Sequence, residues 1–252
     1  MLLGQAVQLA AQKADWKVGI QTWTFHNLTL METLDKTQQL GMGYAEAFFF
    51  QELGAPFPKE TYLNYDLSDD DCALLRHEFK KRGIKPIAFG VASYGTNEEW
   101  DKFFAFAHKI GAHIVTVEPE LNQLDYIESL AKKYDMEVAI HNHPSPCIYA
   151  SAEVVEKALK GRSSLMGVCA DIGHWKRVGE GPLKNLQKLS GRIKVAHLKD
   201  LTDKMEDATW GTGILPVKAF VNELKRQHFN GLISIEYDDF KSDIQEIRNS
   251  LE

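Results

Sequence analysis

The chain has 252 residues, of which 44% are hydrophobic and 25% are charged, and its formal net charge at pH 7 is -6. No apolar stretch approaches the roughly 20 residues of a membrane-spanning helix, and a negative chain has no general attraction to nucleic-acid phosphates. Membrane proteins and nucleic-acid-binding proteins are therefore disfavoured as classes.

The cysteines and the first residues bear on the redox environment and on the targeting of the protein. Three cysteines without a close Cys-x-x-Cys pair indicate neither a disulfide framework nor a thiolate zinc site. Residues 1–15 form an N-terminal lead-in, either a trimmed export signal or a short amphipathic segment, although the basic start of a signal is missing. We therefore leave the compartment open between cytoplasm and periplasm.

From Trp16 onward, short runs rich in β-branched and aromatic residues alternate with segments of helical periodicity. The expected strands are 17–25, 44–50, 85–91, 113–119, 137–143, 166–171, 193–198 and 232–237. The expected helices are 30–40, 68–82, 97–111, 123–134, 150–159, 183–189, 217–227 and 242–251. No linker interrupts this alternation, so residues 16–252 are expected to form one α/β domain, a single (β/α)8 TIM barrel.

An open, doubly wound sheet would give the same alternation of strands and helices. However, no Gly-x-Gly-x-x-Gly turn follows the first expected strand. The closed barrel is therefore preferred, and its active site is expected at the carboxyl ends of the strands.

Four apolar runs each end in a side chain that can bind metal. These side chains are Glu118, Asp171, His197 and Glu236. Any one of them could be an ordinary hydrogen-bonding residue, but a carboxylate at the end of a buried strand is costly unless a cation or hydrogen bonds compensate it. Three carboxylates and one imidazole suit Mn²⁺, Co²⁺, Mg²⁺ or Zn²⁺, so we expect one divalent metal.

The fifth expected strand ends in His141-Asn-His143, and residues two apart on a strand point the same way. We assign His143 to the metal and His141 to acid-base catalysis, although either could fill either role. His174 is placed for proton transfer. Lys199 lies on the same face as His197, where it could bind an oxyanion, shuttle a proton or simply pair with an acid.

Five further residues are expected to contact substrate. Aromatic residues near strand ends could form an apolar floor for a sugar ring, although barrel packing explains them equally well. A tryptophan beside the glycine-rich loop after the seventh strand and one acid of the second strand complete the set. The residues are Trp23, His26, Glu46, Trp175 and Trp210.

Taken together, the motifs resemble the xylose isomerase-like TIM barrel superfamily, which includes sugar isomerases and epimerases, inosose dehydratase and endonuclease IV. The resemblance covers nearly the whole chain and is most specific in four segments. These are Cys169-Ala-Asp171-Ile-Gly-His174, Val195-Ala-His197-Leu-Lys199-Asp200, Gly211-Thr-Gly213 and Ile235-Glu236. The resemblance implies that Asp171, His197 and Glu236 bind a divalent metal.

The chain departs from the family at the fifth strand, which has no carboxylate to match the acid that family epimerases use there. Glu118, one strand earlier, could fill the missing place, with a histidine of the fifth strand as a further ligand or acid-base group. The additional metal ligands of endonuclease IV are not evident, and the negative charge also argues against DNA repair.

We therefore expect a metal-dependent sugar isomerase or epimerase that abstracts a proton next to a carbonyl through a metal-stabilised enediolate. A lyase of the inosose dehydratase or 3-keto-glycoside-eliminating type is a close alternative, because the same enolate can lose a β-substituent. A non-catalytic sugar-binding barrel is the second alternative. The expected partner is a small sugar or keto-sugar; a homo-oligomer is compatible with the family, although no interface pattern predicts one.

Overall fold

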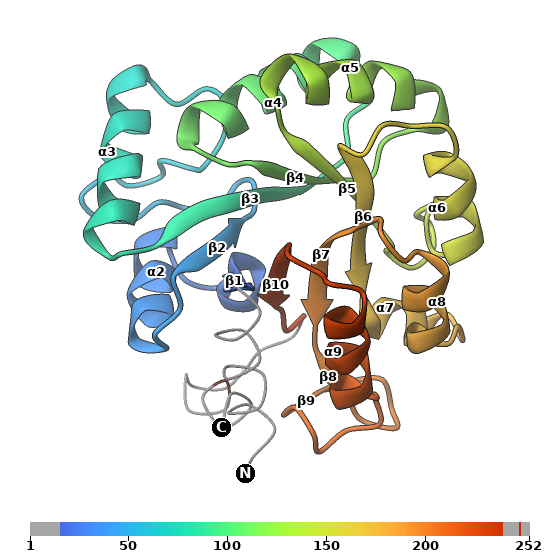
Figure 1. Ribbon diagram of the computed structural model, residues 1–252. Helices are drawn as coiled ribbons and strands as arrows, with labels where there is room; N and C mark the ends of the chain where they lie inside the picture. The colour runs from blue at the N-terminus through green and yellow to red at the C-terminus, as the bar shows by residue number, and fades with distance from the viewer. Residues whose placement is uncertain (1–15, 239–246, 248–252) are drawn as a thin grey trace.

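The computed structural model describes residues 16–238 and residue 247. The lead-in at 1–15, and all but one residue of the helix expected at 242–251, lie outside the described residues. Within the described part, eight parallel strands close into a barrel in the order β1-β10-β7-β6-β5-β4-β3-β2, and the helices lie outside the ring of strands (Figure 1). The expected (β/α)8 TIM barrel is confirmed.

The barrel strands are Lys17–Gln21 (β1), Tyr44–Ala47 (β2), Lys85–Ala92 (β3), Ile114–Val117 (β4), Glu137–His141 (β5), Met166–Asp171 (β6), Ile193–Leu198 (β7) and Leu232–Ile235 (β10). The α-helices are Leu30–Gln39 (α2), Asp69–Lys81 (α3), Asn97–Ile110 (α4), Leu124–Tyr134 (α5), Ala152–Leu159 (α6), Ile172–Arg177 (α7), Pro182–Lys188 (α8) and Val217–Arg226 (α9). Two 3-10 helices, Thr22–Phe25 (η1) and Leu121–Gln123 (η2), and a two-stranded ribbon of Asp200–Leu201 (β8) and Asp207–Ala208 (β9) complete the described elements.

Helix starts follow from local side-chain chemistry. Thr29 and Thr96 each accept a hydrogen bond from a backbone N–H three residues on, and the glutamate at that position returns one to the threonine N–H. These reciprocal bonds satisfy donors that the first turn of a helix leaves unpaired. The helices α2 and α4 therefore begin within one residue of where the sequence predicts.

Several strands end earlier than the sequence predicts, and the difference matters for the site. The chain leaves the sheet at the carboxyl ends of β1, β2, β5 and β10. After β1, for example, the side chain of Gln21 accepts a hydrogen bond from the Trp23 N–H and starts the 3-10 helix η1. The residues that leave the sheet form the rim of the barrel mouth.

Inward-facing side chains change character along each strand. On β10 and just beyond it, the series is Leu232, Ser234 and Glu236, all buried. A period of two places these three on one face of the strand, facing the barrel axis. A small apolar cluster that includes Leu232, Val195 and Ile114 fills the lower barrel, so polar side chains gather only at the carboxyl end.

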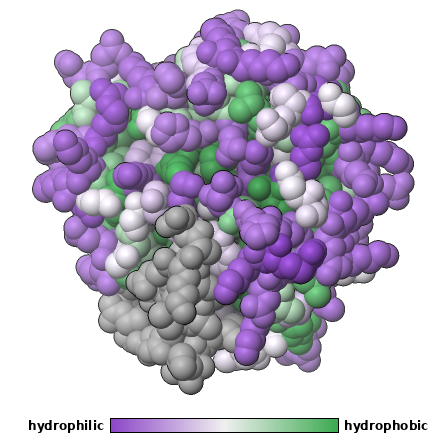
Figure 2. Space-filling model, viewed as in Figure 1, coloured by the Kyte–Doolittle hydropathy of each residue, from purple (hydrophilic) through white to green (hydrophobic). Residues whose placement is uncertain are grey.

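The outer surface is mostly hydrophilic in the view of Figure 2, with hydrophobic side chains in small separate patches. No helix in the described part of the chain has the length and apolar composition needed to cross a bilayer.

The carboxylate of Glu128 joins helix α5 to the segment that precedes β6. It accepts hydrogen bonds from Ser163 N at 3.0 Å and Arg162 Nη1 at 3.1 Å, and it pairs with Lys132. Burial opposes ionisation, but these donors outweigh it and hold the pKa of Glu128 to about 2. Ionised Glu128 therefore stabilises the folded chain.

We expect Glu128→Gln to lower the free energy of unfolding by about 1–2 kcal/mol near neutral pH. Because the folded pKa lies below the unfolded value, near 4.5, the stabilisation is present above that value and is lost as the pH falls towards about 2. Denaturant unfolding across this range should show the gap between variant and wild type closing. Glu153→Gln, which removes an exposed carboxylate paired with Lys157, is the control and should change stability little. A gap independent of pH would contradict the prediction.

Candidate metal centre and active site

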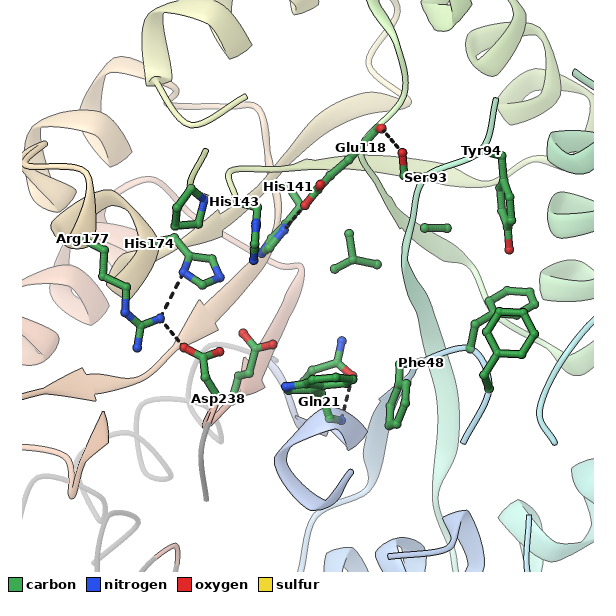
Figure 3. Close-up of a pocket in the computed structure, with 17 residues that line it drawn as sticks. Gln21, Phe48, Ser93, Tyr94, Glu118, His141, His143, His174, Arg177 and Asp238 are labelled. Carbon is green, nitrogen blue, oxygen red and sulfur yellow. Dashed lines mark hydrogen bonds and ion pairs between the residues drawn. The ribbon is translucent and has the colours of Figure 1, made fainter. Parts of the chain in front are cut away.

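A pocket of about 780 Å³ opens at the carboxyl ends of the strands. Its polar side includes His143, His174 and Arg177, and Phe48 and Tyr94 stand on the other side (Figure 3). The lining residues are Gln21, Trp23, Phe48, Phe49, Phe50, Val91, Ala92, Ser93, Tyr94, Glu118, His141, His143, Pro144, His174, Arg177, Glu236 and Asp238. The pocket lies where the active sites of TIM barrels lie.

Four buried side-chain atoms converge at the base of this pocket: Nε2 of His141, Oδ2 of Asp171, Nδ1 of His197 and Oε2 of Glu236. The ammonium of Lys199 lies near the two carboxylate oxygens, whereas the two imidazole nitrogens have no hydrogen-bond partner among the described residues. Oδ2 of Asp171 lies 3.8 Å from each of the two imidazole nitrogens, and Nδ1 of His197 lies 2.9 Å from Oε2 of Glu236. Buried polar atoms without hydrogen bonds are rare in folded proteins and call for a ligand. These donors fit a divalent cation.

Each of the two histidines is held by a second carboxylate behind it. Nδ1 of His141 lies 2.8 Å from Oε1 of Glu118, and Nε2 of His197 lies 2.8 Å from Oε2 of Glu46. An imidazole that donates one N–H to a carboxylate keeps a lone pair on its other nitrogen, and metal-binding histidines are commonly fixed in this way. Both lone pairs then face the cluster.

Glu118 and Glu46 therefore contact the two histidines, and they supply none of the four converging atoms. Glu118, expected as a ligand, has its carboxylate hydrogen-bonded to His141, and Glu46, expected as a substrate contact, is fully buried against His197 and Thr116. Burial raises the pKa of both glutamates, but the histidines that they hold outweigh it and lower the pKa below the ordinary value. Both carboxylates are therefore ionised acceptors.

The charges of the cluster depend on one another. Burial disfavours protonated His141, but the nearby carboxylates of Asp171 and Glu118 outweigh it and raise its pKa to about 9. Burial likewise opposes ionisation of Asp171, yet the ammonium of Lys199 beside it helps to hold its pKa well below the usual range. A cation at these atoms therefore competes with protons, so its affinity should fall as the pH falls.

Lys199 is the most deeply buried charge beside the cluster. Its ammonium lies 3.0 Å from Oδ2 of Asp171, 3.0 Å from Oε2 of Glu236 and 2.7 Å from Oδ1 of Asp238. Burial disfavours the ammonium, but these acids hold the pKa of Lys199 well above its usual range. Lys199 is therefore a fixed positive charge. A Cβ on Gly173 would lie 2.5 Å from Cδ of Lys199, so a glycine there makes room for the lysine stem.

Asp171 is fixed by two neighbours. Its Oδ1 accepts a hydrogen bond from the His174 N–H at 2.7 Å and caps α7, a helix that the sequence did not predict. The side chain of Asn142 brackets the backbone of Asp171, accepting from its N–H and donating to its carbonyl. These bonds leave Oδ2 directed at the cluster.

His143 and His174 form a second pair of imidazoles, with ring centroids 4.7 Å apart. His143, expected as a ligand, is exposed at the rim of the pocket and supplies none of the four converging atoms. Nδ1 of His174 accepts from Nη1 of Arg177 at 3.2 Å. Burial is the main cause that lowers the pKa of His174 well below its usual range, so this imidazole is neutral.

Arg177 and Asp238 are lining residues that sequence reasoning left out of the site. Arg177 pairs with Asp238 and Asp207, which join α7 to the ribbon and to the segment after β10. The signals were present: Arg177 follows His174 by three positions, one helical turn, and Asp238 follows Glu236 by two. Without α7, the sequence pattern could not place the guanidinium near the acids.

Of the remaining residues that were expected to contact substrate, some lie at the pocket and others lie in the hydrophobic core. Trp23 lines the pocket, and His26 stacks behind it with ring centroids 4.7 Å apart. Trp175 and Trp210 are buried in the hydrophobic core and do not line the pocket. The packing interpretation therefore fits both of them, because the helix and the loop that carry them turn their indoles away from the barrel mouth.

The role of Glu118 can be tested directly. We expect Glu118→Gln to weaken binding of Zn²⁺ or Mn²⁺ by about 10–100-fold, because an amide orients the imidazole of His141 less strongly than a carboxylate. Titration calorimetry on chelator-treated protein measures this change. Glu120→Gln, at an exposed position two residues on, should match the wild type. Equal affinities in all three proteins would remove Glu118 from the site.

Comparison with known proteins places this geometry in context. A family profile described as xylose isomerase-like TIM barrel matches residues 34–252. Inosose dehydratase of Bacillus cereus (strain AH820) is 29% identical over 112 residues, which are 44% of this chain and only 32% of that protein. The matched region therefore spans about a third of that relative.

Solved structures agree on the fold. An uncharacterized protein from Parabacteroides distasonis ATCC 8503 is 96% identical, with a TM-score of 0.80 over 94% of this chain and 97% of its own. A D-tagatose 3-epimerase-like protein is 16% identical, with a TM-score of 0.71 and 92% and 94% coverage. IolI with a bound zinc atom is 18% identical, with a TM-score of 0.70 and 93% and 95% coverage.

Proposed function

The chain belongs to the xylose isomerase-like TIM barrel family, and from this premise we propose that it is a divalent-metal-dependent lyase of keto-sugars or keto-cyclitols. In this reaction a proton is removed next to the carbonyl and a β-substituent is eliminated. The observation that carries the proposal is the convergence of four buried ligand atoms, two of them imidazole nitrogens without a hydrogen-bond partner among the described residues, beneath a pocket lined by His143 and His174. Isomerisation or epimerisation, which the sequence placed first, shares the initial proton removal.

The residues that would hold the metal are His141, Asp171, His197 and Glu236, two imidazoles and two carboxylates. This mixed nitrogen and oxygen set suits Mn²⁺, Co²⁺ or Zn²⁺ better than Mg²⁺, which prefers oxygen ligands. A divalent cation bound there supplies positive charge that stabilises negative charge on the carbonyl oxygen of the substrate. Cys169 could join His141 and His197 as a further ligand, although burial raises the pKa of this thiol to about 12.

Two imidazoles remain for proton transfer. We assign His143 as the base, because it is exposed to the pocket and is held by none of the carboxylates that fix His141 and His197. The roles that the sequence gave to His141 and His143 are thereby exchanged. His143 takes the proton from the carbon next to the carbonyl, and the C–H electron pair forms the enolate.

Elimination then needs an acid for the leaving group. The enolate electrons form a double bond to the β-carbon, the β-carbon–oxygen bond breaks, and the departing oxygen takes a proton. The imidazolium that forms on His143 in the first step supplies this proton, and neutral His174, whose Nδ1 accepts from Arg177 and whose Nε2 therefore carries the hydrogen, donates a hydrogen bond to the departing oxygen. A hydroxyl thus leaves as water, or an alkoxyl group as an alcohol.

The placement of these imidazoles favours elimination over epimerisation. Epimerisation needs acid-base groups on opposite faces of the carbon that inverts, whereas His143 and His174 lie side by side on one wall. The facing wall carries Phe48 and Tyr94 (Figure 3), and burial raises the pKa of the Tyr94 hydroxyl far above neutrality. An acid and a base on one face can serve proton removal and loss of a leaving group.

Lys199 has a positioning role in this scheme. It does not line the pocket, and it stays protonated between Asp171, Glu236 and Asp238. Its charge fixes these carboxylates in place by ion pairing, and it makes neither a base nor a covalent nucleophile at neutral pH.

The experiment is to incubate Mn²⁺- or Zn²⁺-loaded protein with an inosose and with a 3-keto-glucoside in deuterated water. We expect a conjugated carbonyl product, seen by ultraviolet absorbance and mass spectrometry. Deuterated starting sugar or its epimer, without elimination, would replace the lyase by an epimerase. If metal is bound but neither deuterium exchange nor product is observed, the non-catalytic sugar-binding barrel is the remaining interpretation.

A further inference from the structure

Apart from the metal cluster, the pocket has an aromatic side that the proposed chemistry does not use. Trp23, Phe48 and Phe50 all line it. Trp23 is 42% exposed and Phe50 is 63% exposed. Single exposed hydrophobic residues are ordinary, but these two line the same cavity as the proposed catalytic histidines, where such exposure marks a binding surface.

The backbone of Phe50 gives an independent sign of constraint. Its φ is +65°, a left-handed conformation that is strained for a non-glycine residue. A hydrogen bond from Phe50 N to Leu63 O at 2.9 Å holds this conformation. An aromatic residue is thus kept where glycine fits better, with its ring exposed at the pocket.

Phe49, the residue before Phe50, packs into the hydrophobic core. Phe49 is buried, and its ring centroid lies 4.6 Å from that of Phe89 and 5.4 Å from that of Phe103. Because Phe49 is fixed in the core between the barrel and α4, the following left-handed residue projects outward from a rigid support. The position of Phe50 is therefore defined by the fold.

Trp23 is also oriented before any ligand binds. Its indole stacks on His26 at 4.7 Å and meets the edge of Phe48 at 5.1 Å. Phe48 N donates to Oγ1 of Thr22 at 3.2 Å, which joins the start of η1 to the segment after β2. Rigid aromatic side chains lose little conformational entropy on binding a ring.

We propose that Trp23, Phe48 and Phe50 form a stacking subsite for a second ring of the substrate, so that the substrate is a glycoside of a keto-sugar and not a free monosaccharide. The inference rests on the proposed function and names its substrate class. The pocket volume of about 780 Å³ lies in the upper part of the roughly 300–1,000 Å³ range of sites for drug-sized ligands. The aglycone ring is recognised by its apolar face, which an aryl group and a pyranose share.

The test measures binding of methyl β-D-glucoside, phenyl β-D-glucoside and cellobiose to the metal-loaded protein by titration calorimetry. None of these sugars carries a ketone, so binding is measured without turnover, and failure here leaves the elimination chemistry testable with an inosose. We expect a ring-bearing aglycone to increase affinity about tenfold over methyl, a typical gain for aromatic stacking. The phenyl and cellobiose arms decide between an aryl and a sugar aglycone.

Trp23→Ala and Phe50→Ala should each remove most of this difference while leaving metal content and the affinity for the methyl glucoside unchanged. Tyr62→Ala is the matched control, because Tyr62 is also 42% exposed, belongs to the same β2–α3 segment as Phe50 and does not line the pocket. Equal affinities of wild type for all three sugars, or no binding of any, would overturn the subsite.

Phe50→Gly keeps the test independent of folding defects. Because glycine adopts a positive φ without steric cost, this variant should unfold at a higher temperature than Phe50→Ala and still lose the preference for ring-bearing aglycones. If Phe50→Gly retained the preference, Phe50 would have no part in the subsite.

Discussion

We expect His141→Ala to purify without stoichiometric metal, whereas His143→Ala retains it. Nε2 of His141 is one of the four converging atoms, and Glu118 fixes its tautomer, whereas His143 lies exposed at the rim. Loss of an outer carboxylate already costs metal affinity about 10–100-fold. Loss of a direct ligand should cost more, so dissociation constants for Zn²⁺ and Mn²⁺ should rise by at least about 100-fold in His141→Ala.

Elemental analysis of protein purified without chelator, followed by calorimetric titration, measures this contrast. Asp171→Ala is a positive control, because it removes another of the converging atoms. Circular dichroism and the unfolding temperature show whether each variant is folded. Metal retained in His141→Ala and lost in His143→Ala would restore the assignment that the sequence pattern alone suggested.

That contrast also shows why the sequence could not choose between the two histidines. The alternation of a strand places His141 and His143 on one face, so both were expected to point into the barrel mouth. The structure ends β5 at His141, and beyond it the chain leaves the sheet. A strand pattern predicts side-chain direction only while the strand continues, and short parallel strands give no clear sequence signal for their last residue.

The fold itself was predictable because it depends on repeated, local signals. Apolar runs, capping residues such as Thr29 and Thr96, and glycines after helices recur along the chain and agree with one another. The positions of Asp171 and His197 near the ends of β6 and β7 were predictable for the same reason, since both strands match their expected bounds. Side chains at the ends of such strands converge at the barrel mouth.

The contacts between the histidines of the site and their carboxylate partners could not be predicted from local sequence patterns. Glu46 meets His197 although 151 positions separate them, and no local pattern records that contact. The helix α7 was missed because it has only six residues, and its capping residue, Asp171, had been read solely as a ligand. A side chain that caps a helix with one oxygen and faces a metal cluster with the other serves both roles.

His143→Ala is expected to abolish catalysis while leaving the metal in place. General acid-base catalysis by a positioned side chain contributes roughly 10²–10⁴-fold to a rate, and we expect a loss of at least 100-fold in deuterium exchange at the carbon next to the carbonyl. The comparison variant is His143→Gln, which preserves polarity and approximate size but cannot accept the proton; it should be equally inactive. Exchange is followed by mass spectrometry of the recovered keto-sugar together with any elimination product.

Because metal content is measured on the same samples, loss of activity through a missing base can be distinguished from loss of activity through missing metal. His174→Gln should behave differently: proton removal should continue, and deuterium should accumulate in the starting sugar, because loss of the β-substituent lacks the hydrogen bond from Nε2 of His174 to the departing oxygen. If His143→Ala exchanged deuterium at the wild-type rate, the base would have to be another pocket-lining group. Glu236 is already committed to the metal cluster, and Asp238 is paired with Lys199 and Arg177. These pairings are the reason we expect proton removal in this pocket to depend on His143.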